Sequence, residues 1–198
     1  MSNKINTDET RLISRLRQGD EDAFRVLMQR YQGWLFSIAY SITLEREESL
    51  DIVQEVFLKV FQNIHAFKEK SKLSTWLRRI TVNECLNWQR RWKRRFRWHH
   101  QPLERDEAGD YPELGTYDYH PGTLYQKKEL EKIVWEKLGK LPEEARAVFV
   151  LREAEGLSYD EIAETLKIKR GTVSSRLFYA RKKLKELLRE YIDEGRDE

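Results

Sequence analysis

The sequence predicts an all-α protein with two small helical domains joined by a flexible acidic linker. Apolar residues recur at helical spacing almost without interruption from residue 8 to about residue 97. Glycines, prolines and acidic residues then replace this period over residues 99–122. Helical spacing resumes near Thr123 and continues to about residue 193. We therefore expect domains at 1–98 and 123–198 with the linker at 99–122, the second domain containing a helix-turn-helix.

Helices of the first domain are expected to begin at residues whose side chains cap free backbone N–H groups. Four residues of this type open apolar periods, namely Asp8, Asp20, Ser49 and Ser74. The helix after Ser49 carries a broad apolar face, which we expect to be buried against neighbouring helices. The members of this face are Ile52, Val53, Val56, Phe57, Val60, Phe61 and Ile64.

The second domain contains a pattern typical of two helices joined by a tight break. Pro142 suits the first turn of one helix, where its missing N–H costs nothing. Ser158 and Glu161 form a capping-box pattern that begins the next helix. A polar run over residues 167–171 interrupts the period, and a basic helix follows. One face of that helix is apolar and is expected to be buried: Val173, Leu177, Ala180, Leu184 and Leu187.

Composition restricts the classes of function. The 198 residues contain 37 basic and 34 acidic side chains, so the clustering of charge is more informative than its total. Cys85 is the single cysteine, which excludes an internal disulfide and predicts a buried structural thiol. We find no cofactor motif, metal-ligand cluster or pattern for a small-molecule substrate. Without a signal peptide or membrane span in the sequence, the expected location is the cytoplasm.

The last basic helix is predicted to read duplex DNA. The residues opposite its apolar stripe point outward: Ser174, Ser175, Phe178, Tyr179, Arg181 and Lys182. An outward phenylalanine gains nothing from water but suits a thymine methyl group, and the surrounding cations attract phosphates. The alternative is an ordinary surface helix packed in an all-α domain.

A second candidate nucleic-acid surface lies in the first domain, where aromatic residues alternate with cations and amides. Lys68, Lys70, Ser71, Lys72 and Ser74 are predicted to form a basic, flexible loop, in which Ser74 can cap a long helix. That helix carries Trp76, Arg78, Arg79, Asn83, Asn87, Trp88, Arg90 and Arg91. Aromatic faces stack on unstacked bases while cations follow the phosphates, so this combination predicts binding of single-stranded DNA. Alternatively Trp76 in part, and Ile80 entirely, belong to the core.

Two further clusters of charge have less specific interpretations. Six basic residues around Trp92 and Phe96, from Arg90 to Arg97, favour a polyanion, although they could also form a solvated helix end. Asp51, Gln54 and Glu55 fall within one helical turn and could dock on basic residues of a partner. Taken alone, this acidic cluster is also typical of a solvated helix face.

The order of these segments resembles an extracytoplasmic-function (ECF) sigma factor of bacterial RNA polymerase. The resemblance rests on DIVQEVFLKVF, STWLRRITVNECLNWQRR, the acidic linker and LPEEARAVFVLREAEGLSYDEIAETLKIKRGTVSSRLFYARKKL, and covers about residues 20–188. It implies two helical domains joined by a flexible linker that runs toward the RNA exit path. It also implies that core polymerase is bound, with the β′ clamp contacting Asp51, Gln54 and Glu55 and the β subunit as a further partner.

The same resemblance implies two promoter-binding sites and a further partner. A membrane-anchored anti-sigma factor would cover the faces described above. The residues implied to bind and melt the minus-ten element are Lys68, Ser71, Lys72, Ser74, Trp76, Arg79, Asn83, Asn87 and Arg90. Those implied to read the minus-thirty-five element are Arg170, Thr172, Ser174, Ser175, Arg176, Phe178, Tyr179, Arg181 and Lys182.

The sequence departs from the family at Ser174 and Tyr179, where many members carry arginine, so its base preference in the upstream element is expected to differ. We hypothesise a non-enzymatic initiation factor that binds core polymerase, recognises a promoter and opens its strands. The alternative is a stand-alone helix-turn-helix regulator. An enzyme acting on nucleic acid lacks support, because catalytic clusters are missing and the pair His99 and His100 lies at the edge of the linker.

Overall fold

The computed structural model describes residues 7–96, 124–189 and 191, and every regular element in these ranges is a helix. The chain forms two compact units: the first contains α1, α3, α4 and most of α2, and the second contains α5 to α8. The predicted all-α class with two helical units is therefore confirmed. The predicted linker, the pair His99 and His100, Arg97 and the predicted resumption of helix at Thr123 lie outside the described residues.

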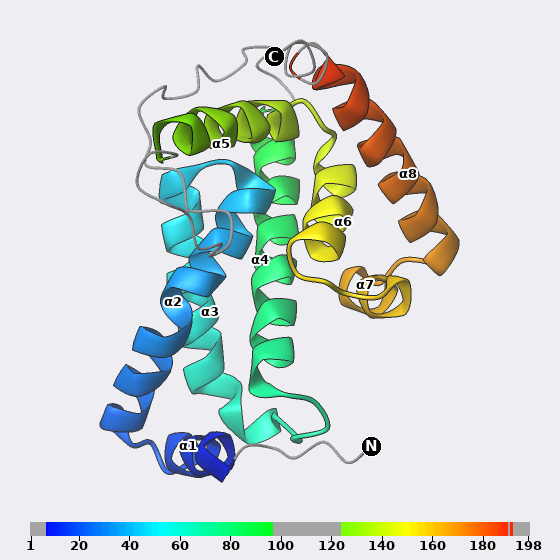
Figure 1. The fold of residues 1–198 in the computed structure, drawn as a ribbon. Helices are drawn as coiled ribbons and strands as arrows, with labels where there is room; N and C mark the ends of the chain where they lie inside the picture. The colour runs from blue at the N-terminus through cyan, green and yellow to red at the C-terminus, as the bar shows by residue number, and fades with distance from the viewer. Residues whose placement is uncertain (1–6, 97–123, 190, 192–198) are drawn as a thin grey trace. The chain divides into compact units, whose positions relative to one another are not determined.

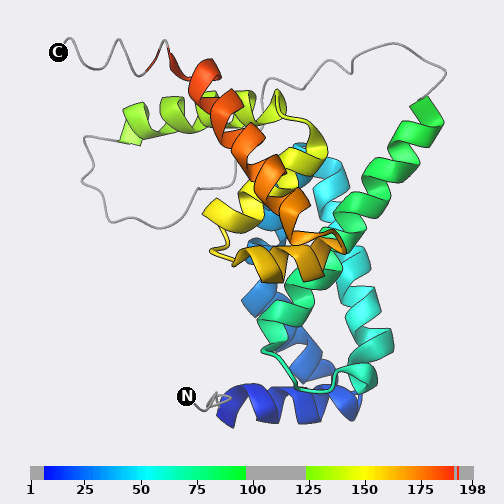
Figure 2. The ribbon, with the colours of Figure 1, turned by 90° about the vertical axis from the view of Figure 1, so that its right-hand side faces the viewer.

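The first unit is built from four helices and one short 3-10 turn. They are α1 (Thr7–Arg17), α2 (Glu21–Thr43), α3 (Arg46–Asn63), η1 (Ile64–Ala66) and α4 (Leu73–Phe96). α3 packs along α4, and α1 lies across the end of the bundle that carries η1 (Figures 1 and 2). Apolar side chains from all four helices form the core, among them Ile13, Leu27, Val56, Val60 and Leu77. Their burial is the main source of stability in this unit.

The predicted helix start at Asp20 is confirmed in detail. Asp20 Oδ1 accepts hydrogen bonds from the backbone N–H groups of Asp22 (3.0 Å) and Ala23 (3.1 Å), as a capping aspartate does. Arg15 Nε donates to the other carboxylate oxygen at 2.7 Å. This hydrogen bond from Arg15, together with the one from Ala23, lowers the pKa of Asp20. The helix predicted at Asp8 begins one residue earlier, at Thr7.

The two predicted serine caps in the first unit are wrong. α3 begins at Arg46, and the Ser49 hydroxyl donates back to the carbonyl of Glu45 at 2.6 Å inside the first turn. α4 begins at Leu73, so Ser74 is already helical. The Leu73 N–H is bound by Glu9 Oε1 at 2.6 Å, from a residue 64 positions earlier. A side chain distant in sequence therefore does what the prediction assigned to a neighbouring serine.

The predicted apolar face of α3 is wider than the surface that the other helices cover. Six of its seven predicted members are buried, but Phe61 is 62% exposed and meets the Phe24 ring edge-on at 5.5 Å between centroids. Phe61 lies at the margin of the face, and its contact with Phe24 of α2 leaves most of its side chain exposed. Ile80, predicted to belong entirely to the core, is half-buried on α4.

The second unit consists of α5 (Leu124–Gly139), α6 (Glu143–Glu153), α7 (Tyr159–Leu166) and α8 (Arg170–Leu187). α8 packs mainly against α6 and α7, as Figure 2 shows for the three helices coloured yellow to red. Its core includes Leu151 and Ile162. Pro142 is the residue before α6 rather than a member of its first turn, and its carbonyl accepts from the N–H groups of Ala145 and Arg146. Among the described helices, none has the length and apolar character needed to cross a membrane.

The single thiol gives a direct test of the core of the first unit. Cys85 is fully buried on α4, as predicted, and this burial raises the pKa of its thiol. Because thiolate is the reactive form, the native protein should react with an aromatic disulfide reagent at pH 8 about a hundredfold more slowly than the denatured chain. The measurement compares labelling rates with and without denaturant. Equal rates would contradict the packing of α4.

Candidate nucleic-acid interfaces

The helix-turn-helix of the second unit begins with the predicted capping box. Ser158 Oγ accepts from the Glu161 N–H at 3.3 Å, and Glu161 Oε2 accepts from the Ser158 N–H at 2.8 Å. α7 ends at Leu166, its C-cap Lys167 has a left-handed φ of 53°, and only residues 167–169 separate α7 from α8. This short connection sets the angle between the two helices.

α8 has the two faces that its sequence predicts. Val173, Leu177, Ala180 and Leu184 are buried, while Leu187 at the end of the predicted stripe is half-buried. The opposite face is open, and Phe178 on it is 72% exposed; Tyr179, on the flank of α8, is 45% exposed. Of the other seven predicted contact residues, Thr172 and Arg176 are half-buried and five are exposed: Arg170, Ser174, Ser175, Arg181 and Lys182.

Several polar groups on this face already have partners. Arg181 donates through Nη2 and Nε to Glu153 Oε1, at 2.6 and 3.0 Å, and the hydrogen bond raises the pKa of Arg181. Arg170 Nε lies 3.4 Å from Asp160 Oδ1. The Ser175 hydroxyl donates to the Thr172 carbonyl at 3.1 Å. Glu153 therefore orients Arg181 from α6, a role that a separation of 28 residues hides from the sequence.

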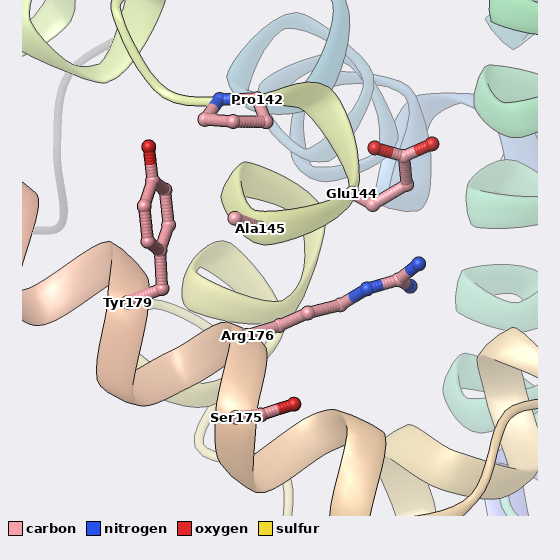
Figure 3. A pocket seen from close by; sticks show the side chains of 6 residues that line it. All are labelled: Pro142, Glu144, Ala145, Ser175, Arg176 and Tyr179. Carbon is pink, nitrogen blue, oxygen red and sulfur yellow. The ribbon is translucent and has the colours of Figure 1, made fainter.

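A shallow pocket of about 220 Å³ separates the flank of α8 from the start of α6. Figure 3 shows Tyr179 standing beside Pro142 while Arg176 extends toward Glu144. Ser175 and Ala145 complete the lining. Two predicted readers of DNA, Arg176 and Tyr179, are thus placed on the side of α8 next to α6, whereas Phe178 lies on the open face.

The predicted single-strand surface runs from the loop before α4 along that helix. Trp76 is half-buried and stacks on the buried ring of Phe67, with 5.0 Å between centroids and 29° between planes. The predicted partial membership of Trp76 in the core is therefore confirmed, while its binding of bases stays a prediction. The exposed members of the predicted set are Lys68, Lys72, Arg79 and Arg90, and the half-buried members are Ser71, Ser74, Trp76, Asn83 and Asn87.

A buried carboxylate on α4 organises part of this surface. Glu84 is 6% exposed, and its Oε1 lies 2.6 Å from Lys59 Nζ on α3. The same oxygen accepts from Asn87 Nδ2 at 3.4 Å, and Asn87 Oδ1 accepts from Arg90 Nη1 at 3.4 Å. Glu84 thus orients Asn87, and Asn87 orients Arg90. The i, i+3 spacing of the three residues was visible in the sequence, but the cation from α3 was not. The side chains of residues 93–96, part of the predicted polyanion cluster, are outside the described set.

The predicted acidic cluster on α3 is open to solvent. Asp51, Gln54 and Glu55 are all exposed, and Glu55 Oε1 lies 3.5 Å from Lys59 Nζ one turn later. Two apolar side chains on the same helix are also exposed, Leu58 at 56% and Phe61 at 62%. The exposed face of α3 is therefore acidic at its centre and apolar toward its C-terminal end, a combination that suits a protein partner with basic and apolar groups.

Metal chemistry finds no support in the described side chains, which contain no group of three or more His, Cys, Asp and Glu residues able to hold an ion. The clusters that the described residues do form are cationic, aromatic and amide-bearing, and such groups suit the binding of nucleic acid.

Each unit matches a known family. Residues 27–95 match the family described as sigma-70 region 2, and residues 131–184 match the family described as sigma-70, region 4. The first match spans most of α2, α3 and α4, and the second ends within α8. The two candidate nucleic-acid surfaces therefore fall within the two matched segments.

Curated relatives match over nearly the whole chain. The ECF RNA polymerase sigma-E factor of Haemophilus influenzae is 38% identical over 180 residues, which cover 88% of this chain and 92% of the relative. The sigma-E factor of Escherichia coli K12 is 36% identical, covering 88% and 91%. The RNA polymerase sigma-H factor of Pseudomonas aeruginosa is 32% identical, covering 92% and 96%.

Solved structures share the fold. The sigma factor RpoE from Bartonella quintana, in complex with the anti-sigma factor NepR, has a TM-score of 0.65 at 24% identity and covers 84% of this chain and 96% of its own. CnrH, in complex with the cytosolic domain of CnrY, has a TM-score of 0.60 at 23% identity, covering 92% and 97%. At these identities the likeness concerns the fold.

Proposed function

The chain belongs to the ECF sigma factors of the sigma-70 family, and from this premise we propose how its two units divide the work of promoter recognition. It is an alternative sigma factor that directs promoter-specific transcription initiation. The observation that carries this conclusion is the match of both units, in order, to curated sigma factors over at least 88% of the chain. The reading as a stand-alone regulator is not favoured, because such a protein would not need the region 2 segment.

We propose that the first unit (residues 1–98) binds core RNA polymerase through the exposed face of α3. Asp51, Gln54 and Glu55 would contact the β′ clamp, and further contacts would involve the β subunit. Their exposure and negative charge support this assignment, since acidic groups complement a basic docking surface and speed association. Leu58 and Phe61 lie beside them with apolar area available for burial.

The same unit is proposed to open the minus-ten element with the loop before α4 and with α4 itself. Lys68, Lys72, Arg79 and Arg90 would follow the phosphates, while Trp76 and Asn83 would receive unstacked bases. Flipping a base costs a few kcal/mol, and stacking on an aromatic ring returns about 1–3 kcal/mol per base. The cost of flipping each base and the gain from stacking it are therefore of similar size. The contacts made by polymerase decide the outcome, and the isolated protein should bind promoter DNA weakly.

The second unit (residues 123–198) is proposed to place α8 in the major groove of the minus-thirty-five element. Phe178 would contact bases, and the cations around it would contact phosphates. Ser174 and Tyr179 are the positions at which base preference would depart from that of arginine-bearing relatives. The intervening acidic segment (residues 99–122) would follow the path of the transcript through polymerase, where acidic side chains can occupy a basic channel.

Further partners and location follow from this role. Two proteins with this fold were solved with protein partners, one of them an anti-sigma factor and the other a cytosolic domain. We propose that this chain likewise has an inhibitory partner, a membrane-anchored anti-sigma factor that covers the polymerase-binding and DNA-binding faces. The chain itself would act in the cytoplasm, where bacterial polymerase works. It would have no cofactor, no small-molecule substrate and no reaction of its own.

Run-off transcription with core polymerase tests the proposed function. Purified protein is added to core enzyme on fragmented genomic DNA, and start sites are mapped; we expect a small set of sites that share two spaced elements. Core enzyme alone and core with the principal sigma factor are the controls. Failure to produce new start sites, combined with tight binding of duplex DNA in a gel shift without polymerase, would instead support a stand-alone regulator.

A further inference from the structure

The loop between η1 and α4, residues 67–72, contains an unusual backbone conformation. Glu69 has a φ of 56°, in the left-handed region that residues other than glycine, asparagine and aspartate rarely adopt. Such a conformation persists only where surrounding contacts hold it. The loop also carries the exposed cations Lys68, Lys70 and Lys72, so the shape of its backbone decides where these charges point.

One arginine of α1 holds the first half of this loop. Arg17 Nη1 donates to Glu69 Oε1 at 2.7 Å, and Arg17 Nη2 donates to the carbonyl oxygen of Phe67 at 2.6 Å. A single planar guanidinium thus binds the side chain of the left-handed residue and the backbone two residues before it. About a third or less of each charged side chain is exposed, 33% for Arg17 and 27% for Glu69, so solvent screens this pair less than a surface pair.

The other end of α1 holds the end of the loop. Glu9 Oε1 accepts a hydrogen bond from the Leu73 N–H at 2.6 Å, so a side chain of α1 binds the first N–H group of α4. The helix packs against η1 and lies across this end of the bundle in both ribbon views (Figures 1 and 2). Two side chains eight positions apart on one short helix therefore bind both ends of the same six-residue loop.

These contacts order the loop that leads into the proposed single-strand surface. Phe67 is buried under Trp76, which fixes the aromatic ring that begins the proposed single-strand surface. A loop that is already ordered loses less conformational entropy when it binds bases than a flexible one does. The lysines can then meet phosphates from fixed backbone positions while their side chains stay solvated.

We propose that Arg17, together with Glu9, acts as a positioning residue for base capture: α1 holds loop 67–72 in the shape that receives the opened strand. This inference rests on the proposed role of the loop in strand opening. It assigns a task to α1, which lies N-terminal to the segment that matches sigma-70 region 2. The competing explanation is that α1 stabilises the first unit without affecting DNA.

The test measures base capture by holoenzyme assembled from full-length variants and core polymerase. The probe is a promoter fragment from the mapped start sites, carrying 2-aminopurine at single positions of the non-template minus-ten strand. For Arg17→Ala we expect capture to need about tenfold more holoenzyme, which corresponds to about 1.4 kcal/mol. Arg17→Lys keeps the charge, but an ammonium group lacks the planar pair of donors that binds both acceptors, so we expect an intermediate loss of base capture.

A double-mutant cycle asks whether Arg17 acts through the left-handed residue. Asparagine tolerates that backbone conformation and lacks the carboxylate, so Arg17→Ala should cost less in a Glu69→Asn background than in the wild type. The matched control is Arg11→Ala, which removes an exposed arginine from the same helix. Thermal unfolding and core binding should stay close to the wild type in all of these variants.

Two results would overturn the inference. One is wild-type base capture by both Arg17 variants, and the other is an equal loss of core binding and base capture, which would show a structural role alone. The variant Lys68→Ala with Lys72→Ala separates this failure from failure of the proposed function. If that variant also captures bases normally, the role of the loop itself is wrong; if it fails while the Arg17 variants succeed, only the positioning role is wrong.

Discussion

Asp51→Arg and Glu55→Arg are each expected to abolish the binding of core RNA polymerase while leaving the fold intact. Both carboxylates are exposed on α3, so neither reversal disturbs the core. Each places a cation where the proposed basic surface of polymerase docks, and like charges brought together at an interface cost several kcal/mol, a loss of about a hundredfold or more in affinity. A pull-down of core enzyme by tagged protein measures the effect.

The matched control is Asp8→Arg, which reverses an exposed acidic side chain on α1 of the same unit. This variant should recover core enzyme as the wild type does. Thermal unfolding of all three variants should remain within a few degrees of the wild type, since exposed substitutions change stability by about 0.5 kcal/mol or less. Normal recovery of core enzyme by both α3 variants would show that this face is not the docking site.

Phe178→Ala is expected to weaken discrimination at the upstream promoter element with little loss of strand opening. The ring is 72% exposed, so its removal leaves no cavity. Each mismatched base pair in a binding site typically costs about 1–3 kcal/mol, roughly fivefold to a hundredfold, and loss of the ring should remove discrimination of up to this size. The measurement is competitive run-off transcription between a promoter with its own upstream element and one with that element scrambled. A template premelted at the minus-ten element should be opened normally.

An exposed aromatic residue outside the proposed reading face supplies the control. Tyr191 is 41% exposed and lies beyond the end of α8, where its ring meets Lys137 Nζ at 5.3 Å. Tyr191→Ala should keep full discrimination, and Phe178→Leu should keep part of it because an apolar contact survives. Unchanged discrimination by Phe178→Ala would refute a reading role for the ring.

Several predictions that depend only on neighbours in the sequence agree with the structure, although the local cap predicted at Ser49 does not. The capping box of Ser158 and Glu161 needs only residues three positions apart, and it forms as expected. The buried stripe of α8 and the exposure of Phe178 depend on helical periodicity alone. The candidate sites in this part of the chain could therefore be located without coordinates, although their roles in binding stay predictions.

Predictions that needed a distant partner failed or were incomplete. Ser74 looked like a helix cap, but Glu9 binds the first N–H of α4 and the helix starts one residue earlier. Phe61 shared the apolar period of α3, yet its side chain is 62% exposed. Arg176, which the resemblance implies as a contact to the upstream element, is half-buried and extends toward Glu144 of α6 (Figure 3).

The sequence by itself determined the helical class, the two helical segments and the outward residues of α8, because helical period and local caps are properties of neighbouring residues. The tertiary structure decided which side chains hold those surfaces in place. Arg17 reaches Glu69 across 52 positions, Glu84 receives Lys59 from α3, and Glu153 orients Arg181 across 28 positions. Contacts of this kind form only when packed helices bring distant residues together, and no local pattern in the chain specifies them.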